Sequence, residues 1–141
     1  MIKILFVCHG NICRSVMAEY MFKDYLNKYN LNDKYYCESR AVSSEEIGND
    51  IYSPAKRCLD KHHIKYDRHY ASKITLDDYN NFDMIYAMDE SNIYLINKLI
   101  NDVDNKICKL LDEDVADPWY TGDFELTYND LDKGIRKILK L

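Results

Sequence analysis

The chain has 141 residues, of which 47% are apolar and 30% are charged, so its composition is that of a globular protein and not of a disordered chain. Its net charge of −5 and its scattered lysines argue against a nucleic-acid partner. We expect no signal peptide, and the sequence has no long apolar run and no paired metal spacing among its five cysteines. We therefore expect one domain over residues 1–141, in the cytoplasm, with no membrane partner.

The first predicted elements are a strand and a helix joined by a short polar turn. Residues 2–7 form a nearly continuous apolar run, which predicts a parallel strand buried on both faces. From residue 15 to about residue 30, apolar side chains recur every three or four positions, which predicts an amphipathic helix. The turn between them, at residues 8–14, follows the carboxyl end of the strand.

A second strand, a loop and a second helix follow. Residues 34–42 predict the strand, although polar residues interrupt it, and residues 43–53 predict the loop. Pro54 fits the first turn of a helix that ends at His62 and His63. These two histidines have no second set of ligands at metal spacing, so we expect no metal site.

The strand and helix patterns alternate again in the second half of the chain. Residues 70–74 predict a short strand or an extended connection, and Thr75 is placed to cap a helix. Residues 84–88 predict a buried strand that ends at residues 89–92, the following residues to Ile100 predict a helix, and residues 106–110 predict the last strand.

The end of the chain combines a polar loop with a helix. Residues 114–122 predict the loop, in which Asp117 precedes Pro118 and is biased toward an extended backbone. From residue 123 onward the pattern is helical. The alternation of strands and helices predicts an α/β fold with a parallel sheet and helices on both faces, whose ligands gather at the carboxyl ends of the strands.

The turn after the first strand carries the residues for phosphoryl chemistry. Backbone N–H groups of a turn that contains Gly10 and leads into a helix bind tetrahedral oxyanions. A cysteine becomes a strong nucleophile when it ionises, and a helix N-terminus and a nearby guanidinium both favour ionisation. Arg14 can hold two phosphoryl oxygens through its planar fork. We predict that this loop binds a phosphoryl group, that Cys8 attacks it, that Ser15 donates a hydrogen bond to the thiolate, and that Asn11 braces the loop.

Cys13 has two interpretations. It lies five residues after Cys8 and could form a reversible disulfide that protects the nucleophile from further oxidation. It could equally be a small residue packed under the loop.

The stretches Val7-Cys8-His9-Gly10-Asn11-Ile12-Cys13-Arg14-Ser15 and Asp117-Pro118-Trp119-Tyr120 closely resemble the low-molecular-weight protein tyrosine phosphatases. The resemblance continues through residues 82–85 and 88–92, so it covers nearly the whole chain. It implies a four-stranded parallel sheet flanked by helices on both faces, with a phosphate-binding loop between the first strand and the first helix. It also implies hydrolysis of phosphotyrosine in proteins, without a cofactor. In that reaction Cys8 forms a phosphocysteine, Arg14 binds the phosphate, and Asp117 is the general acid that later activates water.

The resemblance also implies roles around this catalytic set. It assigns phosphate binding and support of the loop to His9, Gly10, Asn11, Ile12, Cys13, Ser15, His69 and Asp89. By the same likeness His69 supports Asn11, and Trp119 and Tyr120 wall the entrance, where an aromatic substrate ring stacks. A position that often carries an aromatic residue in the family is acidic here, at Glu45 or Glu46, so we expect Glu45 at the entrance to disfavour acidic peptides.

Three other functions remain open at this point. Protein arginine phosphatases tend to carry threonine where Ile12 stands, so an apolar residue there favours a phenolic ring. Thioredoxin-coupled arsenate reductases use a closely spaced cysteine pair, whereas Cys37, Cys58 and Cys108 are far apart. Cysteine phosphocarriers accept a phosphoryl group without hydrolysing it, and they need neither Arg14 nor Asp117.

Overall fold

The computed structural model describes residues 1–141 and contains one four-stranded sheet with the strand order β2-β1-β3-β4. All three strand pairs are parallel, as predicted. The strands are β1 (Ile2–Cys8), β2 (Tyr35–Ala41), β3 (Met84–Ala87) and β4 (Ile107–Lys109). The helices are α1 (Arg14–Lys28), α2 (Ser53–Lys61), α3 (Leu76–Asn81), α4 (Glu90–Leu99), α5 (Pro118–Thr121) and α6 (Phe124–Leu139).

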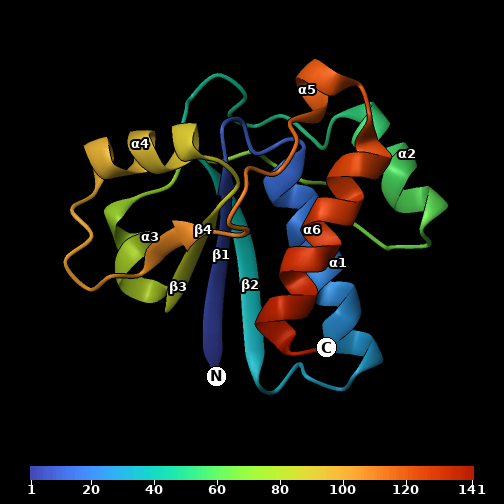
Figure 1. Ribbon diagram of the computed structural model, residues 1–141, viewed down its shortest axis with the longest axis horizontal. Helices are drawn as coiled ribbons and strands as arrows, with labels where there is room; N and C mark the ends of the chain where they lie inside the picture. Colours follow the sequence, from blue (N-terminus) through green and yellow to red (C-terminus); the bar gives the residue numbers. More distant parts are fainter.

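Helices cover both faces of the sheet, with α1, α2 and α6 on one face and α3 and α4 on the other (Figure 1). Alternate side chains of β1 serve the two sides, because successive residues of a strand point in opposite directions. Ile4 and Phe6 belong to the larger core cluster under α1 and α6, and Leu5 and Val7 belong to the smaller cluster on the other face. This two-sided burial accounts for the unbroken apolar run at the start of the sequence.

One connection differs from the sequence-based expectation, and a second one decides between two predicted alternatives. Residues 118–121 form the single-turn helix α5 inside the stretch predicted as a polar loop, because Pro118 presets the helical backbone angle and Asp117 caps the turn. Residues 70–74 are an extended connection, paired with the sheet only through one bridge from Lys73 to Ala41. No helix of the protein combines the length and the apolar character that a membrane crossing requires.

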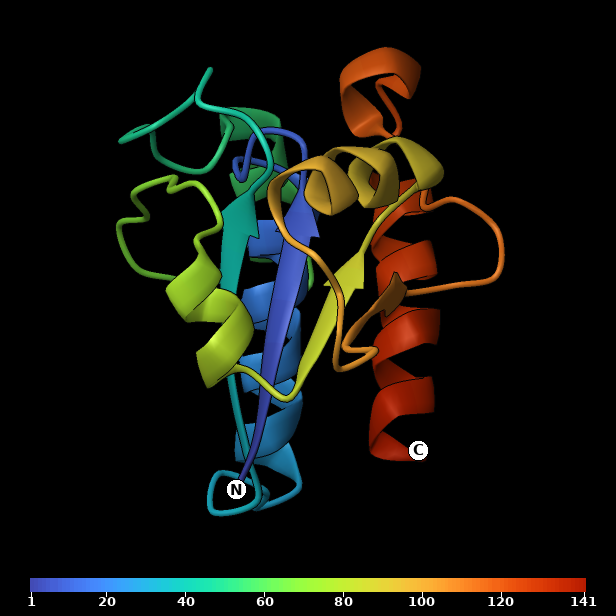
Figure 2. The same ribbon diagram turned by 90° about the vertical axis from the view of Figure 1, so that its left-hand side faces the viewer.

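The strand order creates a switch point between β1 and β3. The chain leaves β1 toward β2 on one side and returns to β3 on the other side, and ligands of open α/β sheets bind at the crevice where the order reverses. Figure 2 shows the loop after β1, helix α4 and helix α5 gathered at the carboxyl ends of these strands. This edge of the sheet holds the candidate site.

Candidate active site

A cavity of about 500 Å³ opens at this edge of the sheet. Its walls come from four parts of the chain: the loop between β1 and α1, the segment after β2, the start of α4, and α5 with the residue before it. The lining residues are Cys8, His9, Gly10, Ile12, Cys13, Arg14, Glu45, Glu46, Asp89, Ser91, Asn92, Asp117, Trp119 and Tyr120.

Cys8 ends β1 and places its sulfur at the base of the cavity, where it receives two polar contacts. The backbone N–H of Asn11 donates to Cys8 Sγ at 3.3 Å, and Ser15 Oγ lies 3.0 Å from the same sulfur. The side-chain amide of Asn11 donates to Ser15 Oγ at 2.8 Å, which leaves the serine hydroxyl hydrogen free to point at the sulfur. Both contacts can therefore direct a hydrogen-bond donor at the Cys8 sulfur.

Asn11 holds the loop in a tightly curved shape. Its φ of 62° lies in the left-handed region, which asparagine tolerates better than most residues. The residue is fully buried and every polar atom of its side chain has a partner. Its amide donates to Ser39 Oγ at 2.9 Å as well as to Ser15, and its Oδ1 accepts from the backbone N–H of Ser72 at 3.2 Å. Contacts from distant segments thus fix a strained turn.

His69 lies behind the loop and contacts Asn11 twice. Its Nε2 is 2.7 Å from the Asn11 backbone oxygen and 3.1 Å from Asn11 Oδ1. Since both of these oxygens are acceptors, Nε2 carries the hydrogen. Burial lowers the pKa of His69 against the opposing effect of the hydrogen bond to the Asn11 backbone. The imidazole is therefore neutral and supports the loop from outside the cavity.

The lowered pKa of His69 predicts a pH-dependent stability. A histidine with a depressed pKa in the folded protein gives its full stabilisation above its unfolded pKa of about 6.5, and that stabilisation is lost as the pH falls. We expect His69→Gln to lower the free energy of unfolding by about 1 kcal/mol at neutral pH and to flatten its decline toward acid pH. Urea unfolding of both proteins above and below this pH measures the difference. The exposed His63, in the variant His63→Asn, is the control. An unchanged acid slope in His69→Gln would contradict the assignment.

Arg14 is the first residue of α1 and is almost completely buried. Its Nη1 donates to Asp89 Oδ2 at 2.8 Å and to the backbone oxygen of Val115 at 3.0 Å. Burial opposes the positive charge of Arg14, but Cys8, Asp117 and Asp89 outweigh it and raise the pKa of Arg14. The guanidinium is thus a fixed cation beside the thiol.

Asp89 is itself held in place by the start of α4. It caps this helix in a reciprocal capping box, in which its Oδ1 accepts from the backbone N–H of Asn92 and the Asn92 side chain accepts from the backbone N–H of Asp89. One carboxylate oxygen of Asp89 thus serves the helix and the other orients Arg14.

Asp117 reaches the same cavity from a position 103 residues after Arg14. It caps α5, with Oδ1 accepting from the backbone N–H of Trp119 at 3.0 Å, and its other oxygen lies 3.4 Å from Arg14 Nη2. Its backbone is extended, as predicted for a residue before proline. The fold therefore places a thiol, a guanidinium and a carboxyl group around one cavity.

Comparison with known proteins gives a consistent answer. The family model described as low molecular weight phosphotyrosine protein phosphatase matches residues 3–141. The chain belongs to this family.

Relatives and solved structures agree with this assignment. The low molecular weight protein-tyrosine-phosphatase YfkJ of Bacillus subtilis is 35% identical, and the match covers 99% of this chain and 94% of that protein. The structure of a low molecular weight protein tyrosine phosphatase from Streptococcus pyogenes has a TM-score of 0.93 at 40% identity and covers 99% of this chain and 92% of that one. The structure of a Drosophila arginine phosphatase has a TM-score of 0.88 at 28% identity and covers 99% and 96%.

The entrance of this low molecular weight tyrosine phosphatase carries both aromatic and acidic side chains. Trp119 is 59% exposed and Tyr120 is 85% exposed, and the ring of Tyr52 packs against Trp119 with a centroid distance of 5.2 Å. Glu45 also lines the cavity, and its Oε2 lies 3.2 Å from His9 Nε2.

Cys13 lines the cavity of the phosphatase but differs from Cys8 in its environment. Burial, followed by the charges of Cys8 and Asp117, raises the pKa of Cys13 to about 12. Its thiol is therefore protonated at neutral pH, and Cys8 is the better placed of the two for nucleophilic attack.

The predicted site residues fall into two layers. Asn11 within the loop, Ser15 in α1 and His69 behind the loop support it from outside the cavity, and all the others line the cavity. Sequence reasoning missed Ser39, which joins Asn11 to Glu19 through a hydrogen bond of 2.6 Å to Glu19 Oε1. Ser39 is one of the polar residues that interrupt the second predicted strand, and this interruption was the signal in the sequence that could have indicated a role for it.

Proposed function

We propose that the protein hydrolyses phosphotyrosine in proteins through a phosphocysteine on Cys8. The observation that carries this proposal is the shared cavity of Cys8, Arg14 and Asp117, which come from opposite ends of the chain. Phosphate monoesters react very slowly in water, so a catalyst needs a nucleophile, fixed positive charge and a proton for the leaving group. These three residues match those needs one by one.

In the first step Cys8 Sγ attacks phosphorus as a thiolate. The sulfur–phosphorus bond forms, the phosphorus–oxygen bond to the tyrosine ring breaks, and the phenolic oxygen takes a proton from Asp117. Arg14 and the loop N–H groups offset the charge on the phosphoryl oxygens. Asp89 acts through Arg14, because it accepts a hydrogen bond from Nη1 and so fixes the orientation of the guanidinium group.

In the second step water attacks the phosphocysteine. Asp117, now a carboxylate, takes a proton from the water while the new phosphorus–oxygen bond forms and the sulfur–phosphorus bond breaks. Inorganic phosphate leaves, Cys8 returns to the thiolate, and Asp117 is protonated for the next cycle. The hydroxyl of Ser15, 3.0 Å from Cys8 Sγ, stabilises the departing thiolate.

The apolar side chain of Ile12 and the rings of Trp119 and Tyr120 favour a phenolic substrate over a charged one. None of Cys37, Cys58 and Cys108 lines this cavity, which argues against the thiol relay of an arsenate reductase. All five cysteines are free thiols, in keeping with the reducing cytoplasm that we propose as the location of the enzyme.

Phosphoarginine is the second candidate substrate, because Glu45 and Glu46 both line the cavity. Two carboxylates at the entrance would attract the guanidinium that carries the phosphoryl group. The similarity to a Drosophila arginine phosphatase gives this candidate further support.

The test is turnover of matched peptides with phosphotyrosine or phosphoarginine at the same position, together with p-nitrophenyl phosphate, in a metal chelator. We expect a burst of nitrophenol followed by steady turnover, and a phosphotyrosine rate at least about tenfold above that of phosphoarginine. A burst of one equivalent without turnover would indicate a phosphocarrier. If phosphoarginine reacts faster than phosphotyrosine and this reaction slows in Glu45→Gln and Glu46→Gln, the substrate is phosphoarginine. The phosphocysteine mechanism would then stand unchanged.

A further inference from the structure

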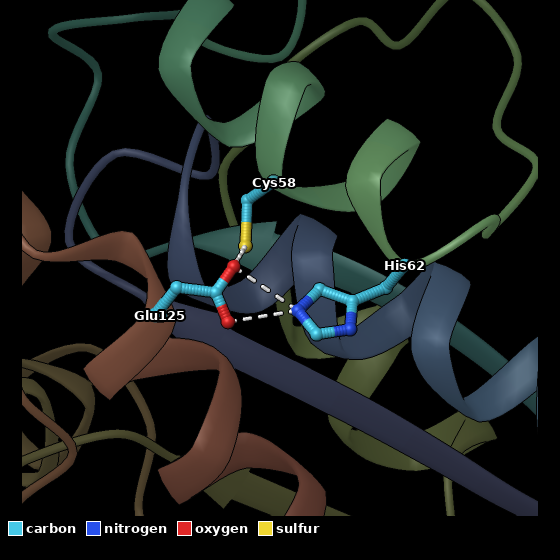
Figure 3. Close-up of side chains that lie close together, drawn as sticks. All are labelled: Cys58, His62 and Glu125. Carbon is cyan, nitrogen blue, oxygen red and sulfur yellow. Dashed lines mark hydrogen bonds and ion pairs between the residues drawn. The ribbon is translucent and has the colours of Figure 1, made fainter.

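Helices α2 and α6 bring three potential metal ligands together away from the active-site cavity (Figure 3). Glu125 Oε2 lies 2.8 Å and Oε1 3.1 Å from His62 Nε2, and Cys58 Sγ lies 3.7 Å from Glu125 Oε1. The three ligand atoms all lie within 4.8 Å of one another. None of these residues lines the cavity around Cys8.

The sequence spacing of the first two ligands follows from the helix. Cys58 lies in the last turn of α2, and His62 is the C-cap residue that directly follows this helix. The two residues are four positions apart, so their side chains lie about one helical turn apart on the same side. Glu125 comes from the first turn of α6, 63 residues beyond His62, and packing of the two helices completes the set.

We propose that Cys58, His62 and Glu125 form a binding site for Zn²⁺. Thiolate, imidazole and carboxylate are the three ligand types that zinc takes in proteins, and three protein ligands leave a fourth position for water. In a tetrahedral site with the usual bond lengths, sulfur and oxygen ligands are about 3.6 Å apart and nitrogen and oxygen ligands about 3.4 Å apart. The separation of 3.7 Å between Cys58 Sγ and Glu125 Oε1 already fits, and the contact of 3.1 Å between Glu125 Oε1 and His62 needs a shift of a few tenths of an ångström. The remaining pair, Cys58 Sγ and His62 Nε2, lies within 4.8 Å and has to close to about 3.6 Å when the ion binds.

The ligands are held in place and remain open to an ion. The ring of His62 stacks on the ring of Tyr128 with a centroid distance of 3.6 Å and an interplanar angle of 6°, which restricts its rotation. The side chains of His62 and Glu125 are 27% and 40% exposed, so a hydrated ion can reach them. Cys58 is buried beneath them.

Zinc has to displace a proton and a cation. Burial, together with the charge of Glu125, raises the pKa of Cys58 to about 11, so coordination releases the thiol proton to solvent. The ammonium of Lys61 lies 3.5 Å from Glu125 Oε1 and is 70% exposed, so it can swing into water when the ion enters. The hydrogen bonds of Cys58 and His62 to Glu125, at 3.7 and 2.8 Å, would then give way to bonds from each of the three side chains to zinc. The ion would thereby link α2 to α6.

The test uses a Cys8→Ser, Cys13→Ser background, which removes the thiols of the active-site loop. The chelator-treated protein is titrated with Co²⁺, whose thiolate complexes absorb in the near ultraviolet, and then with Zn²⁺ in competition. We expect one equivalent of Co²⁺ with a thiolate charge-transfer band, displacement of that ion by Zn²⁺, and a higher melting temperature with Zn²⁺.

Matched variants decide whether the band belongs to this cluster. Cys58→Ser is expected to abolish the band, and His62→Gln, at a partly exposed position that leaves the fold intact, to weaken binding at least about tenfold. Cys108→Ser carries the same change outside the cluster, and His63→Asn also replaces a histidine by an amide side chain; both variants are expected to bind normally. Absence of a thiolate band in the background protein would overturn the proposal, as would equal binding in Cys58→Ser and Cys108→Ser.

Discussion

Cys8→Ser is expected to abolish the nitrophenol burst and to lower kcat by at least about 10³-fold while phosphate binding survives. A serine hydroxyl stays protonated at neutral pH, whereas the proposed reaction starts from a thiolate on Cys8. Arg14 and the loop N–H groups, which we propose hold the phosphate, are untouched by this change. Rapid-quench measurement of the burst and calorimetric titration with phosphate separate the two effects.

Cys108→Ser is the matched control for this experiment. Cys108 lies in β4 and does not line the cavity, so its loss should leave the burst and the turnover near those of the parent. Turnover in Cys8→Ser at the parent rate would rule out the phosphocysteine. Loss of phosphate binding in the same variant would indicate that the loop had changed shape.

Asp117→Asn is expected to slow formation of the phosphocysteine about 10²–10³-fold for substrates with poor leaving groups, such as phosphotyrosine, and much less for p-nitrophenyl phosphate. Asparagine keeps an oxygen that can accept from the Trp119 N–H, so α5 retains its cap, while the transferable proton and the carboxylate charge beside Arg14 are lost. Single-turnover rates are measured for aryl phosphates whose phenol leaving groups have increasing pKa. The rate should fall more steeply with leaving-group pKa in Asp117→Asn than in the parent.

Asp123→Asn supplies the control for the acid. Asp123 caps α6 with the same kind of contact, accepting from the backbone N–H of Leu126, and it does not line the cavity. Its substitution should leave the leaving-group dependence unchanged. A loss in Asp117→Asn that is equal for good and poor leaving groups would assign Asp117 a structural role and remove the general acid from the mechanism.

The architecture was predictable because its signals are local. The apolar run before Cys8 and the change of period after Ser15 can each be recognised within one segment. The bounds that they predict lie within one or two residues of those of β1 and α1. The one-turn helix α5 was missed because four residues cannot display a helical period.

The site was predictable only in part, because much of it depends on long-range contacts. The spacing of Cys8 and Arg14 indicates a phosphate loop by itself, whereas an aspartate before a proline is most often a turn former. Asp117 was assigned through the family resemblance, and its contact with Arg14 depends on how β4 and the following loop cross the sheet. Ser39 likewise contacts Asn11 only because β2 pairs with β1 in one register.

The left-handed turn at Asn11 also links activity to the completion of folding. Its three anchoring partners, Ser39, His69 and Ser72, lie 28, 58 and 61 residues farther along the chain. A collapsed chain that has formed β1 and α1 alone would carry Cys8 and Arg14 without the backbone geometry that aims the loop N–H groups. Enzymatic activity is therefore a late reporter of the native state, set by docking of distant segments rather than by the local helix and strand.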